Sequence, residues 1–290
     1  MKGSPRPVPR LVLGVGSLDQ PVRTTRDRQL EVSSRFKESE SLAVALVKAV
    51  AVGAEALLVP PTNDVRQALA ELDKDLPLYV RTPHTPMADD LRWESPLSLE
   101  PGDESGAAWN PAKAGAAALN LLPLSMAADL ASRIWPRMER EMGTFRASSV
   151  EGVVLPYTVT DLALAADQPR VYERLLKVAR ARVGRVGFET RNMGHLLERL
   201  AAWGVAPDFV LGPVNAHGVG MLPDADSVLS AIAASAVPVI ATELRAGGID
   251  TLEEGAAYAR RKNVWGLCAE LVDMEDVPRE IKALVASRAA

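Results

Sequence analysis

The sequence predicts an α/β fold, a (β/α)8 barrel of the TIM type, and two observations support this prediction. Eight short apolar segments alternate with helical ones, and seven of them are followed directly by a helix. In the stretch 184–248 each strand changes from apolar to polar residues at its C-terminal end, as barrel strands do at a binding face. The alternative is a doubly wound open sheet, but no Gly-x-Gly-x-x-Gly run follows the first strand.

Length and composition indicate one ordinary globular domain over residues 1–290. The hydrophobic fraction is 48% and the charged fraction 24%. A net charge of -4 gives no reason to expect nucleic-acid binding. The single cysteine, Cys268, excludes a disulfide framework and a cysteine-cluster metal site. Without a signal peptide or an apolar run of about 20 residues, a cytoplasmic protein with no membrane partner is expected.

The first half of the chain is expected to supply four strands. Their predicted ranges are 11–16, 56–59, 78–80 and 152–155. Helices are expected at 41–52, with Ser41 as its cap, and at 62–72. The polar, basic-leaning segment 17–39 is predicted to be a loop over the barrel mouth.

An extended loop and a helical insertion are predicted between the third and fourth strands. The irregular segment 85–109 carries many acidic residues, and its part from Asp89 to Glu104 is expected to act as a lid. Helices are then expected at 111–122 and 125–142, the second with a kink at Pro136.

The second half of the chain should supply the other four strands and their helices. The strands are predicted at 186–190, 209–212, 238–242 and 264–269. The helices are predicted at 161–166, 169–182, 192–203, 224–234 and 276–287.

Alternation along the last strands predicts a shared pocket of carboxylates. Alternate residues of a barrel strand point inward, so Glu189 shares a side with Gly187, and Glu243 shares one with Ala241. Glu270 follows Gly266 and Cys268 in the same way. We therefore expect Glu189, Glu243 and Glu270 to occupy one pocket at the C-terminal face.

The types of these residues indicate acid–base chemistry or metal binding. Glu189, Glu243 and His217 are predicted to transfer protons or to bind a divalent metal. Tyr157, after the fourth strand, either donates a proton or packs. Substrate-binding roles are predicted for the following residues: Arg81, Arg191, Asn215, Arg245, Gly247 and Gly248. The alternative is that the glutamates form a salt-bridge network with the arginines at the barrel rim.

The turn at 246–254 has two interpretations. Gly247 and Gly248 precede a helix capped by Asp250 or Thr251, so backbone N–H groups could approach a phosphate, as after strand seven of phosphate-binding barrels. The alternative is a tight turn followed by a helix cap. Elsewhere, His195 is expected to face solvent or a neighbouring helix, and Cys268 to be a buried small residue.

Several segments, in order, resemble the aldo-keto reductase barrels. They include Leu11-Val-Leu-Gly-Val-Gly16, Arg182-Val-Gly-Arg-Val-Gly-Phe-Glu-Thr190, Asp208-Phe-Val-Leu-Gly-Pro-Val-Asn215, Val239-Ile-Ala-Thr-Glu-Leu-Arg-Ala-Gly-Gly248 and Pro278-Arg-Glu-Ile-Lys-Ala-Leu284. The resemblance covers most of the barrel. It implies a carbonyl reductase that uses a nicotinamide cofactor and an aspartate, tyrosine, lysine and histidine at the ends of strands two, three and four.

This chain departs from that catalytic pattern. The second strand is followed by Pro60-Pro61-Thr62, the third ends at Arg81, and the fourth is followed by Pro156-Tyr157, so none of the four catalytic residues is carried over. The first hypothesis is therefore a lyase or isomerase that acts on a small polar or anionic metabolite, with or without a divalent metal. The second is an NADPH-dependent reductase with Tyr157 as proton donor, and the third is a barrel without catalysis that serves as a binding module.

Overall fold

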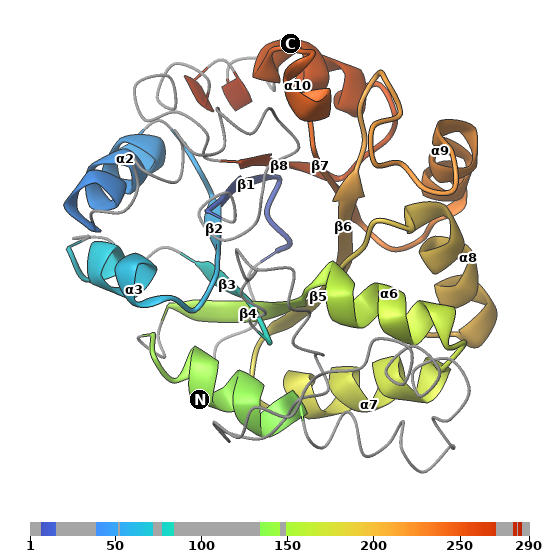
Figure 1. Ribbon diagram of the computed structural model, residues 1–290, viewed down its shortest axis with the longest axis horizontal. Helices are drawn as coiled ribbons and strands as arrows, with labels where there is room; N and C mark the ends of the chain where they lie inside the picture. The colour runs from blue at the N-terminus through green and yellow to red at the C-terminus, as the bar shows by residue number, and fades with distance from the viewer. Residues whose placement is uncertain are drawn as a thin grey trace, which may run out of the picture.

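The chain folds into a closed barrel of eight parallel strands with helices around its outside (Figure 1). The computed structural model describes residues 7–15, 39–51, 53–71, 77–83, 134–145, 149–270, 281–282 and 284–285. The strands are β1 (Leu11–Gly14), β2 (Ala56–Val59), β3 (Leu78–Arg81), β4 (Val150–Leu155), β5 (Arg185–Glu189), β6 (Phe209–Pro213), β7 (Val239–Thr242) and β8 (Gly266–Glu270). Each strand pairs with the next, and β8 pairs with β1, so the predicted barrel is confirmed and the open sheet is excluded.

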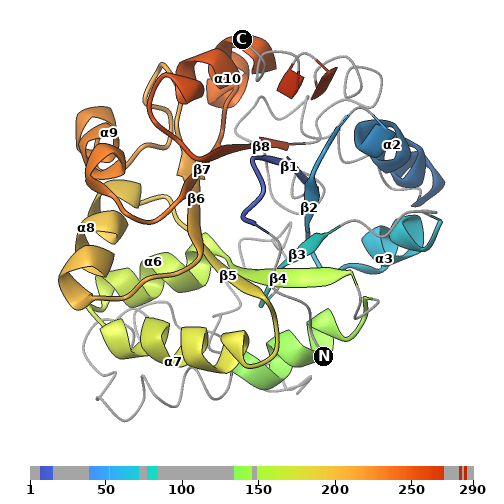
Figure 2. The same cartoon turned by 180° about the vertical axis from the view of Figure 1, so that it is seen from behind.

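Helices separate successive strands and cover the barrel on all sides that are described (Figure 2). They are α2 (Ser39–Ala51), α3 (Asn63–Ala70), α6 (Tyr157–Ala165), α7 (Pro169–Arg180), α8 (Met193–Trp203), α9 (Ala225–Ala234) and α10 (Leu252–Arg260). Two predicted starts were wrong. α2 begins before Ser41, and α6 begins at Tyr157 rather than Asp161, directly after Pro156. No helix of the described part of the chain is long and apolar enough to cross a membrane.

The predicted insertion lies where it was expected, because residues 82–149 separate β3 from β4. Residues 134–142 are helical, in agreement with the end of the predicted second helix, and Thr82 Oγ1 at the end of β3 donates to Glu141 Oε2 (2.5 Å). The mouth-loop residues 17–38, the predicted lid, the helix at 111–122 and His84 lie outside the described residues. That residues 1–290 form a single domain stays a prediction.

Two groups of buried side chains account for the two sides of the strands. One group fills the barrel interior and includes Val12, Tyr79, Phe209 and Cys268. The other packs between the strands and the helices. The rings of Tyr79 and Phe209 meet edge to face inside the barrel, with centroids 5.3 Å apart. A Cβ on Gly187 would lie 2.2 Å from the Phe209 ring, so glycine is needed there to leave room for the aromatic side chain.

Gly255 offers a test of how α10 packs on the barrel. A Gly→Ala change inside a helix ordinarily stabilises it by about 1 kcal/mol. Here, however, the new Cβ would lie 1.8 Å from the backbone oxygen of Leu244, so the helix would have to shift. We expect Gly255→Ala to lower the free energy of unfolding, by about 1–3 kcal/mol, as overpacking does.

Urea denaturation of the purified protein measures this change. Glu253→Ala, at an exposed position of the same helix, is the control and should change the free energy of unfolding by less than about 1 kcal/mol. A Gly255→Ala variant more stable than the wild type would contradict the close contact between α10 and Leu244.

Candidate functional site at the C-terminal mouth of the barrel

Three charged side chains from three strands meet inside the C-terminal end of the barrel. Arg81 Nη2 of β3 donates to Glu189 Oε1 of β5 at 3.0 Å and lies 3.9 Å from Glu270 Oε1 of β8. The side chain of Arg81 is 6% exposed, that of Glu189 13% and that of Glu270 23%. We call these three residues the mouth triad.

Strand alternation explains why the triad points inward. Tyr79 and Cys268 belong to the interior group, so Arg81 and Glu270, two residues further along their strands, point to the same side. Phe188 packs toward the helices, and Glu189 therefore points inward as predicted. Gly14 makes room for Glu270, because a Cβ at Gly14 would lie 2.6 Å from the Glu270 carboxyl carbon.

Glu189 has one oxygen that the described part of the protein leaves without a hydrogen bond. Its Oε1 accepts from Arg81, whereas its Oε2 is buried and has no hydrogen-bond partner among the described residues. Buried polar atoms nearly always have partners, and an exception calls for an explanation, such as a catalytic role or a bound water or ion. This oxygen can accept a proton or an N–H or O–H group of a bound molecule.

A second polar group lies at the ends of β4 and β5. Leu155 of β4 is paired with Phe188 of β5, so the residues that follow the two strands lie at similar height. The guanidinium carbon of Arg191 lies over the ring of Tyr157, 4.0 Å from its centroid. This is a cation–π contact between the first residue of α6 and the loop after β5.

Asp161, one helical turn beyond Tyr157, fixes this loop. Its Oδ1 accepts from Thr190 Oγ1 (2.5 Å) and its Oδ2 from the backbone N–H of Arg191 (3.1 Å). Burial raises the pKa of Asp161 above 3.8, although the hydrogen bonds from Thr190 and Arg191 oppose that rise. The sequence interpretation missed this role, because the partners of Asp161 lie about 30 residues away along the chain.

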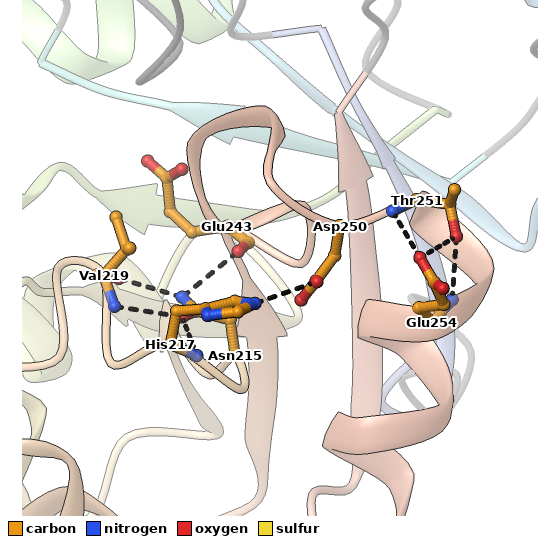
Figure 3. A network of polar contacts seen from close by, with 7 residues as sticks. All are labelled: Asn215, His217, Val219, Glu243, Asp250, Thr251 and Glu254. Carbon is orange, nitrogen blue, oxygen red and sulfur yellow. Dashed lines mark hydrogen bonds and ion pairs between the residues drawn. The ribbon is translucent and has the colours of Figure 1, made fainter.

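The predicted position of Glu243 beside Glu189 rested on an alternation that was wrong. Ala241 packs with the helix-facing group, and Ile240 points into the barrel. β7 ends at Thr242, and Glu243 follows with a φ of 52°, so the strand pattern does not extend to it. Its backbone oxygen accepts from Asn215 Nδ2 (3.3 Å), and Figure 3 shows its carboxylate directed away from His217 and Asp250.

His217 contacts Asp250 instead of the predicted glutamates. Its Nε2 lies 2.9 Å from Asp250 Oδ1, and its side chain is 42% exposed (Figure 3). This pair connects the loop after β6 with the loop after β7. Across the described ranges, no group of three or more His, Cys, Asp or Glu side chains is arranged to bind a metal ion. The predicted joint action of His217, Glu189 and Glu243 thus finds no support in the geometry.

Asn215 is fully buried and organises the same two loops. Its Oδ1 accepts from the N–H groups of Val219 (3.0 Å) and His217 (3.3 Å), and its Nδ2 donates to the backbone oxygens of Val219 (2.9 Å) and Glu243 (3.3 Å). These contacts use both ends of the amide. Asn215 therefore shapes the mouth, and its predicted direct contact with substrate stays a prediction.

The turn after β7 has the geometry of a tight turn and a helix cap. The N–H groups of Gly248 and Asp250 both donate to the Arg245 carbonyl (2.8 and 3.1 Å), so neither can bind a phosphate in this conformation. Gly247 and Gly248 have φ values of 75° and 95°, which favour glycine. Thr251 is the helix cap and forms a capping box with Glu254. The predictions that Arg245, Gly247 and Gly248 bind substrate remain untested.

The remaining candidates lie where the sequence indicated. His195 of α8 is exposed, and Cys268 is buried inside the barrel. Burial raises the pKa of the Cys268 thiol well above its usual range, which is typical of an unreactive cysteine.

Comparisons with known proteins show which solved structures share this fold. No protein-family model matches the sequence, and neither does any curated protein. Among solved structures, a protein from Pseudomonas aeruginosa assigned to the aldo-keto reductases superimposes with a TM-score of 0.60 at 14% identity. That match covers 98% of this chain and 95% of the other.

Two further solved structures carry enzyme names. Aldose reductase from Giardia lamblia matches with a TM-score of 0.52 at 10% identity, over 96% of this chain and 87% of that one. Glycerol dehydrogenase from Gluconobacter oxydans matches with a TM-score of 0.51 at 11% identity, over 94% of this chain and 86% of that one. The predicted distant resemblance to aldo-keto reductase barrels is confirmed, as a likeness of fold.

The raised pKa of Asp161 predicts a pH-dependent contribution to stability. The folded state holds this proton to a higher pH than the unfolded chain, so stability falls as pH rises from 3.8 through the folded pKa. The Asp161→Asn variant has no titrating group at this position, so it does not lose stability in this way. We expect the stability of the wild type minus that of the variant to decrease as pH rises above 3.8.

Denaturation in urea over a pH series on either side of 3.8 tests this expectation. Asp224→Asn is a control of opposite sign, because a hydrogen bond from the Ser227 backbone lowers the pKa of Asp224. Its stabilising contribution should be lost as pH falls below 3.8. If Asp161→Asn showed no difference in slope from the wild type, Asp161 would not be buried as described.

Proposed function

We propose that this protein is an oxidoreductase that uses a nicotinamide cofactor to reduce a small carbonyl compound at the C-terminal mouth of the barrel. The observation that carries the proposal is the fold, since solved barrels assigned to the aldo-keto reductases superimpose over nearly the whole chain. The polar groups at the mouth support it, because binding sites of such barrels lie at the C-terminal ends of the strands.

The mouth has polar atoms that suit a nicotinamide carboxamide. Glu189 Oε2 would accept from the amide N–H group, and this is the buried oxygen that has no partner among the described residues. The bound cofactor would supply hydride. Arg81 holds the Glu189 carboxylate in place through Oε1 and leaves Oε2 for the ligand.

Tyr157 is the residue that we propose as the proton donor to the substrate oxygen. It begins α6 at the barrel mouth, and its hydroxyl makes no hydrogen bond to the described residues. Arg191 lies over its ring. As the hydroxyl proton leaves, negative charge develops on the phenol, and the guanidinium stabilises it. Arg81 cannot take this role, because arginine is not deprotonated in proteins.

A titration with NADPH, followed by tryptophan fluorescence, tests cofactor binding. Saturable quenching is expected in the wild type and equally in Tyr157→Phe, because the phenol hydroxyl is not assigned to cofactor binding. NADPH oxidation with a panel of aldehydes and ketones should then be slower in Tyr157→Phe by about 100-fold or more, the usual contribution of a positioned proton donor.

The unfolding midpoint of Tyr157→Phe serves as the control for folding. Absence of saturable NADPH binding in the wild type would overturn the proposed function. Full turnover in Tyr157→Phe would exclude this residue as the donor and leave the cofactor proposal standing.

Acid–base chemistry of the lyase or isomerase kind is the second candidate, and the free oxygen of Glu189 favours it. A buried carboxylate oxygen without a protein partner can remove a proton from carbon next to a carbonyl group. His217 and Glu243 are not part of this arrangement. A third alternative, a binding module without catalysis, predicts neither NADPH binding nor proton exchange.

Proton exchange in D2O separates this candidate from the reductase. Without NADPH, NMR would follow loss of the proton next to the carbonyl group of small ketones. If Glu189 is the base, the wild type exchanges this proton and Glu189→Gln does not, while the variant stays folded because a Gln oxygen can still accept from Arg81. Equal exchange in both proteins would remove Glu189 from this role.

A further inference from the structure

The side chain of Arg191 is unusual among the arginines of the mouth. Its guanidinium makes no hydrogen bond or ion pair to any residue that the structure describes, and its side chain contacts the ring of Tyr157. Arg81, by contrast, is bound to Glu189. A guanidinium carries five N–H donors in a fork that matches two oxygens of a carboxylate or phosphate.

The backbone of Arg191 is held from both sides. Its N–H donates to Asp161 Oδ2 of α6 (3.1 Å), and its carbonyl accepts from the N–H of Leu222 in the loop after β6 (3.3 Å). Leu222 in turn accepts from the N–H of Gly194 at the start of α8 (3.3 Å). Since little ordering of the loop is left to occur, an ion that binds the guanidinium loses less free energy to conformational entropy.

Asp161 is the nearby carboxylate that attracts Arg191. Its two oxygens, however, accept from Thr190 Oγ1 and from the Arg191 backbone, so the carboxylate fixes the loop and forms no ion pair with the guanidinium. The guanidinium carbon lies 4.0 Å from the centroid of the Tyr157 ring, and this contact is a cation–π interaction that occupies no oxygen acceptor.

We propose that Arg191, supported by Tyr157, binds an oxyanion group of the substrate, a carboxylate or a phosphate. The substrate is then an oxo acid or a phosphorylated carbonyl compound. This inference rests on the proposed oxidoreductase function for the reacting carbonyl group, whereas the oxyanion site itself does not depend on it. Arg191 is a specificity-determining residue, and Glu189 and Arg81 lie in the layer below it.

Calorimetric titration at low salt, without cofactor, tests the site with two matched probes. Pyruvate carries the carboxylate, and methyl pyruvate is its neutral ester; inorganic phosphate is titrated separately to compare the two oxyanions. The wild type should bind pyruvate or phosphate saturably. It should bind the ester at least about tenfold more weakly, because a hydrogen bond to a charged group usually contributes about that factor to the affinity.

Three variants separate the role of Arg191 from a general effect of charge. Arg191→Met should weaken the oxyanion about tenfold or more and leave the ester unchanged. The oxyanion affinity of Arg191→Lys should lie between those of the wild type and Arg191→Met, since lysine keeps the charge and loses the planar fork. Arg199→Met removes the same charge from an exposed arginine of α8 and should bind like the wild type.

Each outcome decides whether Arg191 binds an oxyanion group of the substrate. Unchanged oxyanion affinity in Arg191→Met, equal affinity for acid and ester, or no oxyanion binding by the wild type would overturn the proposal. A lower NADPH affinity of Arg191→Met, with the difference in affinity between pyruvate and its ester unchanged, would also overturn the proposal. Arg191 would then bind a phosphate group of the cofactor. Oxyanion binding without NADPH binding would support this site and reject the oxidoreductase function.

Discussion

The contact on which the mouth of this barrel depends is the one between Arg81 and Glu189. A charge inside a closed barrel loses its hydration, and only a close opposite charge offsets that loss. Arg81 reaches Glu189 and lies near Glu270, so one guanidinium connects β3, β5 and β8 at the same height. Buried ion pairs are weak sources of stability, and replacing such pairs by apolar side chains of similar volume is often neutral or stabilising. The charged layer therefore supports the proposal that the mouth binds a ligand.

The polar residues of the mouth lie in two layers. In the lower layer the carboxylates lie against the barrel interior, whose aromatic side chains below them exclude water. In the upper layer Asp161 fixes the loop after β5 and thereby positions Arg191 over Tyr157. The lower layer is held by strands, and the upper layer is held by α6 and the loop after β5.

The sequence was sufficient for the barrel and for part of the site. Regular alternation in β5 predicted that Glu189 faces inward, and it does, because the strand continues through this residue. The same reasoning failed at Glu243, since β7 ends one residue earlier and a positive φ turns the chain. The partners of His217 and the role of Asp161 come from loops and a helix start, where side-chain direction depends on long-range contacts that no local pattern encodes.

The buried amide of Asn215 has a consequence for how this face of the protein can change. One side chain satisfies backbone groups of the loop after β6 and of the residue that follows β7. A new sequence in either loop must therefore preserve those groups or provide a substitute for them. The two loops form one module, which evolution or loop grafting would have to exchange as a whole, and the hydrogen bonds of Leu222 with Arg191 and Gly194 connect the loop after β5 to it.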